Sequence, residues 1–127
     1  MERRNISSGS PYEPVIGFSR AVVAGDRVFV AGTAPVMSDG AEPPSDAYAQ
    51  AKRCLEIIVE ALREAGARPE HVVRTRTYLI DGSDWEEVGR AHGEVFAAVR
   101  PSSTMVVVRG FLDPRWRVEM EADAVLP

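Results

Sequence analysis

Acidic side chains recur at every second position near the end of the chain. Glu119, Glu121 and Asp123 alternate with small or apolar residues, namely Val118, Met120, Ala122 and Ala124. A period of two is typical of a strand that has one covered face and one polar face. Because a positioned carboxylate can act as a general base toward water, this strand is the first candidate for chemistry.

Other residues that could do chemistry are few. His71 stands at the start of an expected strand and His92 on the apolar side of an expected helix, where a lone histidine is usually structural. Cys54 is the only cysteine, and it falls in an apolar helical stripe that predicts a small buried hydrophobe. Such a set makes no recognisable zinc site, and the glycines form no phosphate-binding loop. We therefore expect neither a metal nor a cofactor.

Length and composition limit the class of protein. The 127 residues suffice for one domain, 1–127, and the 45% apolar and 27% charged residues are ordinary for a soluble globular protein. The net charge is −4 and no basic tract is present, so nucleic acid is not an expected partner. No apolar run approaches the roughly 20 residues of a membrane span. We expect a cytoplasmic protein with neither membrane contact nor intrachain disulfide.

Hydrophobic periodicity and turn residues predict the elements that position these side chains. A hairpin is expected around Gly25-Asp26, with a loop after it, and each of two helices follows an apolar stripe with 3 and 4 spacing. Ser45 or Asp46 should cap the first helix and Gly66 should end it. The expected segments are the hairpin 18–32, loop 34–45, helices 46–65 and 85–99, and strands 71–81, 104–109 and 116–126. The order ββαβαββ predicts an α+β fold with an antiparallel-rich sheet and both helices on one face.

Four stretches in this order together resemble a known family. They are IGFSRAVVAGDRVFVAGTAPV (16–36), the helix start DAYAQA (46–51), the strand VVRTRTYLID (72–81), and RPSSTMVVV (100–108) followed by VEMEADAV (118–125). They are similar to the Rid family, also called YjgF-like and historically labelled endoribonuclease L-PSP, over nearly the whole chain. The resemblance implies a chorismate-mutase-like subunit with a mixed sheet, a homotrimer built around a central barrel, and small-molecule clefts between subunits.

The resemblance also implies a catalytic pair, of which this chain keeps one member. In archetypal members, an arginine after the proline that precedes the fourth strand holds the carboxylate of a 2-imino acid. A glutamate in the fifth strand handles the attacking water. Here Glu119 stands at the glutamate position, whereas Ser103 stands where the arginine should be. The family's first-strand tyrosine has no clear counterpart near Phe18, and Gly89 replaces an asparagine.

The resulting hypothesis is a deaminase that hydrolyses small enamines or imines other than ordinary 2-imino acids. Glu119 would direct water, and groups near Gly32 and Met105 would orient the substrate. The substrate would lack an α-carboxylate or present it to Arg20 or Arg109, although for both arginines, as for Glu13, a role as a solvated strand or interface charge is favoured. The full set of expected substrate-binding residues is Phe18, Arg20, Gly32, Thr33, Ser103, Thr104, Met105 and Arg109.

Two alternatives stay open. The first is a non-catalytic small-molecule binding or interaction module on the same trimer. The second is a ribonuclease, which the acidic charge and the lack of a suitable histidine pair disfavour.

Overall fold

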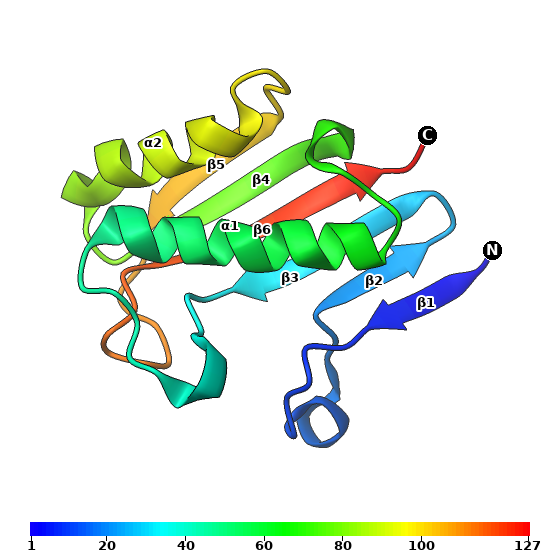
Figure 1. Ribbon diagram of the computed structural model, residues 1–127, viewed down its shortest axis with the longest axis horizontal. Coiled ribbons are helices and arrows are strands. Elements are labelled where there is room, and N and C mark those ends of the chain that lie inside the picture. The colour runs from blue at the N-terminus through cyan, green and yellow to red at the C-terminus, as the bar shows by residue number, and fades with distance from the viewer.

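A six-stranded sheet with two helices on one face is the framework of the computed structural model, which describes residues 1–127 (Figure 1). The helices are α1 (Ala47–Glu64) and α2 (Trp85–Phe96). The strands are β1 (Arg3–Ile6), β2 (Ala21–Ala24), β3 (Arg27–Thr33), β4 (Val72–Leu79), β5 (Ser102–Val107) and β6 (Val118–Val125). The sheet order is β1-β2-β3-β6-β4-β5, and only β4 and β5 are parallel neighbours. The predicted α+β class is confirmed.

The predicted element order is present from β2 onward, but one strand precedes it. β1 lies in the N-terminal segment that the sequence indicated only as a polar entry, and it pairs antiparallel with β2 at the sheet edge. Of its four residues only Ile6 is buried. Because a strand with one buried residue has no apolar alternation, the sequence carried no signal for it.

Several boundaries near the C-terminus differ from those predicted, among them the start of β5, which is Ser102 instead of residue 104. β5 ends at Val107 instead of residue 109, and α2 ends at Phe96 instead of residue 99. Trp116 was expected on the core face of the last strand, but that strand begins at Val118, and Trp116 is only partly buried. Its amide donates to the carbonyl of Asp113 at 3.1 Å, so a turn occupies this position. The Asp113 carboxylate also accepts from the amide of Arg115 at 2.8 Å, and side-chain turns of this kind are not visible in a hydrophobic pattern.

α1 forms where the apolar stripe predicted it. The Asp46 carboxylate accepts a hydrogen bond from the amide of Ala49 at 3.0 Å, which caps the first turn. Gly66 follows the helix with φ at 88°, a left-handed conformation that glycine adopts readily. Cys54 is fully buried in the stripe, and this burial raises the pKa of its thiol. It is therefore a packing residue, as predicted.

The side chains of β6 alternate between the two faces of the sheet. Its side chains at even positions, Val118, Met120, Ala122 and Ala124, are buried beneath the helices together with those of β3 and α1. The alternate side chains, which include Glu119, therefore lie on the face without helices. Neither helix has the length and apolar composition that a membrane span requires.

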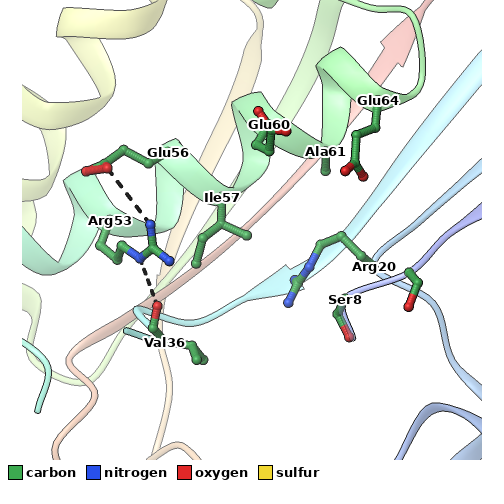
Figure 2. A pocket seen from close by; sticks show the side chains of 10 residues that line it. Ser8, Arg20, Val36, Arg53, Glu56, Ile57, Glu60, Ala61 and Glu64 are labelled. Carbon is green, nitrogen blue, oxygen red and sulfur yellow. Dashed lines mark hydrogen bonds and ion pairs between the residues drawn. The ribbon is translucent and has the colours of Figure 1, made fainter. Parts of the chain in front are cut away.

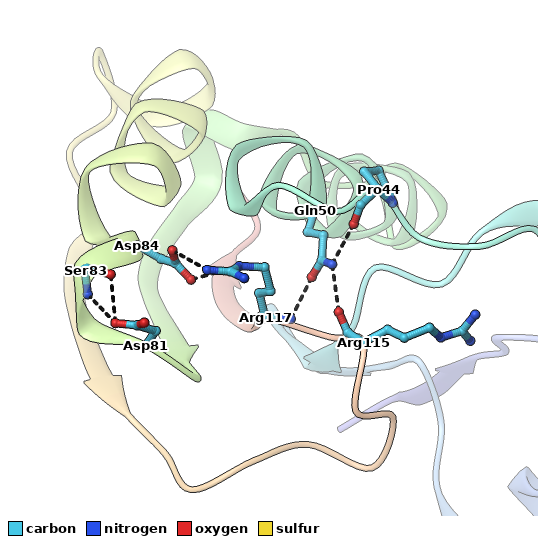
Figure 3. Close-up of polar contacts among 7 residues, drawn as sticks. All are labelled: Pro44, Gln50, Asp81, Ser83, Asp84, Arg115 and Arg117. Carbon is cyan, nitrogen blue, oxygen red and sulfur yellow. Dashed lines mark hydrogen bonds and ion pairs between the residues drawn. The ribbon is translucent and has the colours of Figure 1, made fainter.

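A polar network fixes the start of β6 (Figure 3). The Gln50 amide of α1 donates to the carbonyls of Pro44 at 2.7 Å and Arg115 at 2.9 Å. Its oxygen accepts from the amide of Arg117 at 2.7 Å. The Arg117 guanidinium forms two hydrogen bonds to the buried carboxylate of Asp84, at 2.8 and 3.1 Å. Because Glu119 follows two residues later, this network positions it.

Candidate functional site

Glu119 is half-buried against an irregularity in the neighbouring strand. The ladder between β3 and β6 shifts register between Val30 and Thr33, which is a β-bulge, and Gly32 lies within it. A Cβ atom added at Gly32 would lie 3.5 Å from Oε1 of Glu119. On the other side, Tyr78 of β4 is the register partner of Glu119. The bulge thus lets the carboxylate lie directly against backbone, a common arrangement near ligand sites.

The environment of Glu119 favours its protonated form. Burial raises the pKa of the carboxyl, the positive charge of Arg20 lowers it, and the negative charge of Glu121 raises it further. The net effect is a pKa above the usual 4.5. A carboxylate perturbed in this way is a candidate for acid-base work, since its pKa moves toward the working pH.

The other two acids of β6 are already engaged. The Tyr78 hydroxyl donates a hydrogen bond to Glu121, and the Arg76 guanidinium lies 3.7 Å from the same carboxylate. Asp123 pairs with Arg76 at 3.4 Å and with Arg74 at 4.0 Å. Glu119 has no ion pair and no hydrogen bond within the chain. Of the three acids it is the one free to act on a bound molecule.

Arg20 and Thr33 meet on the helical side of the same bulge. Nη1 of Arg20 donates to Oγ1 of Thr33 at 2.9 Å, and this hydroxyl donates to the carbonyl of Ala31 at 2.8 Å. The guanidinium is turned toward α1, where it lines a cavity (Figure 2). The guanidinium therefore lies on the opposite side of Gly32 from Glu119. Its positive charge still lowers the pKa of that carboxyl.

Glu13 and Phe18 belong to the segment that leads into β2. The Glu13 carboxylate accepts hydrogen bonds from the hydroxyls of Ser7 and Ser8, and the bonds from Ser8 lower its pKa. This acid holds its own loop together. Phe18 ends a short π-helical turn, Glu13–Gly17, and 40% of its surface is exposed.

Residues of β5 form a second group, on the edge of the sheet. Thr75 of β4 donates its hydroxyl hydrogen to Oγ of Ser103 at 2.8 Å, and the same Oγ1 lies 2.8 Å from Nε2 of His92. Ser103 thus faces α2. Met105 faces α2 as well, because its Cε would lie 4.0 Å from a Cβ added at Gly89.

The two groups do not meet within one chain. β4 lies between β5 and β6, and Ser103 is on the helical face whereas Glu119 is on the other face. Thr104 does share the face of Glu119, since its register partner is Arg76. Arg109 lies beyond β5, exposed and without an ion pair. A site that joins residue 103 to Glu119 therefore requires a second copy of the chain.

Sequence reasoning missed Thr75 and Tyr78. Thr75 joins Ser103 to His92, and Tyr78 holds Glu121 beside Glu119. One signal could have found Thr75, since the alternation of residues 71–81 places a hydroxyl on the covered face, where polar atoms need partners. His92 proves partly buried and hydrogen-bonded, as a structural histidine should be, and burial lowers its pKa. No group of three or more histidine, cysteine or acidic residues is arranged to hold a metal ion.

Comparison with known proteins places this geometry in context. Residues 9–126 match the model of the family described as Endoribonuclease L-PSP. An uncharacterized protein of Streptomyces coelicolor is 47% identical over 121 residues, which cover 95% of this chain and 90% of that protein. A RutC family protein of Pyrococcus abyssi is 34% identical over 88% of each chain. A Mycobacterium tuberculosis member of the YjgF/YER057c/UK114 family, known from its crystal structure, is 42% identical in sequence. It superposes with a TM-score of 0.89 over 98% of this chain and 100% of that one.

Proposed function

The chain belongs to the endoribonuclease L-PSP family, to which the YjgF and RutC proteins are related, and from this premise we propose that it hydrolyses small imines or enamines. The observation that carries the proposal is Glu119. It is half-buried, its pKa is raised, and it is the acid of its strand without a partner. A general base must be able to contact the water that it deprotonates, and its pKa must lie near the working pH.

The chemistry that we propose uses one carboxylate and one water. Ionised Glu119 accepts a proton from the water while the water oxygen attacks the carbon of the C=N bond. The imine nitrogen takes this proton, which gives a neutral carbinolamine. Glu119 then moves the hydroxyl proton of the carbinolamine to its nitrogen as the C–N bond breaks, and a carbonyl compound and ammonia leave. An enamine first takes a proton on carbon and loses one from nitrogen, which gives the imine. The exposed backbone of Gly32, beside the carboxylate, offers polar groups that can orient the substrate.

We propose that the substrate has no carboxylate at the position where archetypal members read one. Ser103 carries no charge, and its hydroxyl already accepts a hydrogen bond from Thr75. Arg20 turns its free N–H groups toward α1 and away from Glu119. Of the two arginines considered as carboxylate anchors, Arg109 is the one left, and it would be the anchor for a substrate that does carry an acid.

The reacting cleft is proposed to form between copies of the chain in a homotrimer. Residues of β5 are exposed, and the face without helices carries partly exposed apolar side chains such as Phe29, Val106 and Val125. Charged residues of β4 and β6 lie among them. A face that is partly apolar and partly charged is typical of subunit interfaces. Pairing of this face with the exposed β5 edge of a neighbouring copy would bring Ser103, Thr104 and Met105 of that copy near Glu119.

The proposal is tested by the rate of ammonia or amine release. Neutral aldimines would be generated in situ by an amine oxidase, and 2-iminobutyrate by an amino-acid dehydratase. We expect the protein to accelerate hydrolysis of the neutral imines more than that of 2-iminobutyrate. Glu119→Gln should reduce the acceleration about 10²–10⁴-fold, the usual contribution of a general base. Asp123→Asn is the matched control, because it neutralises a paired acid of the same strand. It should retain most of the activity.

Equal rates for the wild type and Glu119→Gln would overturn the proposal and favour a different function. That second candidate is a non-catalytic binding module on the same assembly. The inward hydrogen bond of Ser103 supports it, since this half of the cleft then has no charged group of its own. In that case a ligand would protect the wild type and Glu119→Gln equally against thermal unfolding, with no turnover in either.

A further inference from the structure

A cavity of about 290 Å³ lies on the helical side of the sheet, outside the cleft proposed above. α1 forms one wall from Arg53 to Glu64, and the loop after β1, with Ser7 and Ser8, contributes to the other. Figure 2 shows Arg20 on this second side, beside Ser8 and across from α1. Polar and charged side chains thus make up most of the lining, which suits a small polar ligand.

Arg20 brings to this cavity a positive charge that no carboxylate matches. Its one side-chain hydrogen bond joins Nη1 to Oγ1 of Thr33 at 2.9 Å, and no acidic oxygen lies within 4.0 Å of it. The side chain is mostly buried, and burial lowers its pKa. A partly buried cation without an anion is unfavourable, so an occupant with an anionic group is expected. Thr33 holds the guanidinium in place and leaves the other N–H donors available.

Glu64 brings a matching negative charge from the opposite wall. It projects from the last turn of α1, at the end of the cavity where Arg20 lies on the other wall (Figure 2). Only its backbone carbonyl has a charged partner, the guanidinium of Arg4 at 3.1 Å, and its carboxylate has no ion pair.

The other charges that line the cavity are satisfied. Arg53 lies 3.9 Å from Glu56 and donates to the carbonyl of Val36 at 2.8 Å. Glu60 is paired with Arg63, one turn along the helix. The cavity therefore holds one unmatched cation and one unmatched anion on facing walls.

We propose that this cavity binds a small zwitterion, with its carboxylate on Arg20 and its ammonium group on Glu64. A guanidinium binds a carboxylate through parallel charge-assisted hydrogen bonds, and a carboxylate accepts well from an ammonium group. A simple anion would leave Glu64 unmatched and would meet the three glutamates of α1. A simple cation would leave Arg20 unmatched. The class of ligand is thus an amino acid whose two charges are spaced to match the two walls.

The site stands apart from the proposed reaction but is coupled to it. Arg20 and Glu119 lie on opposite sides of the β3 bulge, and the Arg20 charge lowers the pKa of Glu119. A carboxylate on Arg20 would cancel part of that effect. Binding should therefore raise the pKa of Glu119, and by linkage protonation of Glu119 should strengthen binding.

Binding is measured by calorimetry on the full chain with glycine, β-alanine, 4-aminobutyrate and 5-aminopentanoate, beside butyrate and butylamine as single-charge probes. At least one zwitterion should bind about tenfold or more tighter than either single-charge probe, as one added charge-assisted contact implies. Arg20→Gln should abolish binding. Glu64→Gln should bind the zwitterion no better than butyrate. Glu64 is exposed, so this variant should fold normally.

Two controls separate this site from the cleft. Glu56→Gln, on the same wall but paired with Arg53, should keep the preference for the zwitterion. Glu119→Gln should also bind the zwitterion, whether or not the protein proves to be a hydrolase. The proposal is wrong if no zwitterion binds, if butyrate binds equally well, or if Glu64→Gln binds like the wild type. Binding lost in Glu119→Gln but kept in Arg20→Gln would assign the ligand to the cleft instead.

Discussion

Three acids of one strand, two residues apart, have different roles because their neighbours differ. Asp123 faces two arginines and Glu121 receives a tyrosine hydroxyl, so their charges are already compensated. Glu119 faces the bulge at Gly32 instead, where it is partly buried and has no contacting cation or hydroxyl group to compensate its charge. The distinction between a structural and a functional acid is thus made at the scale of single side chains.

The raised pKa of Glu119 predicts how stability depends on pH. The folded chain binds this proton more tightly than the unfolded chain, whose carboxyl titrates near 4.5. The stabilisation by the protonated form is complete below 4.5 and is lost as pH rises through the folded value. At neutral pH the ionised carboxyl therefore opposes folding. Glu119→Gln should raise stability at pH 7 by under about 1 kcal/mol, since the group is partly solvated.

Thermal unfolding of the wild type and Glu119→Gln, followed from pH 3.5 to 7.5, checks this prediction. The advantage of the variant should shrink as pH falls toward 4.5. Asp123→Asn serves as the comparison, and it should destabilise at pH 7 because it leaves Arg74 and Arg76 without their common partner. A Glu119→Gln variant less stable than the wild type at pH 7 would show that the carboxylate is favourably bound and not strained by burial.

At the scale of elements, the start of β6 depends on one side chain of α1. Gln50 is almost fully buried and uses both its amide nitrogen and its oxygen on backbone groups of the segments that flank it. These bonds tie the loop before α1 and the loop before β6 to the same helix (Figure 3). The position of Glu119 therefore depends on a contact between residues 67 apart in sequence.

Gln50→Met tests this dependence. Methionine fills a similar volume but leaves the amide of Arg117 and two carbonyls without partners, which should cost about 2–3 kcal/mol of unfolding free energy. Denaturant unfolding measures the loss, and the exposed Lys52→Met is the control, with a change within about 0.5 kcal/mol. If the rate of imine hydrolysis falls further than the folded fraction does, the network also positions Glu119. A Gln50→Met variant as stable as the wild type would mean that water replaces these bonds.

At the scale of the whole molecule, one face of the sheet is left without helices. It combines the ion pairs of β4 and β6 with apolar side chains, including Phe29 at 44% and Val106 at 43% exposure. β5 at the sheet edge also offers unpaired backbone groups. Edges and faces of this kind are normally covered by another chain.

We predict that the protein is a trimer in solution. Size-exclusion chromatography with light scattering should give three times the 13.9 kDa of one chain. Val106→Glu places a charge on the face that we expect to be covered, and it should shift the mass toward the monomer. Leu112→Glu is the matched control, since Leu112 is 98% exposed in the loop before β6 and should not affect assembly. A monomeric wild type would exclude the shared cleft and with it the proposed role of β5.

Local pattern by itself determined most of the fold. The apolar stripes of α1 and α2, the turn at Gly25, and the alternation of β6 reflect contacts with a regular period, which a single chain displays in its sequence. For the same reason the buried role of Cys54 and the outward direction of Glu119 could be predicted. β1 could not, since only Ile6 of its four residues enters the core.

The tertiary structure alone decided how the candidate residues group. Sequence treated Arg20 as an alternative partner for the cleft of Glu119, but its guanidinium is hydrogen-bonded to Thr33 and lines the cavity beside α1. The resemblance assigned Ser103 and Glu119 to a cleft between subunits, and within one chain β4 separates their strands and the pleat places them on different faces. Strand order, bulges and side-chain hydrogen bonds join residues distant in sequence. They depend on the free energy of the whole packed chain, which no local period records.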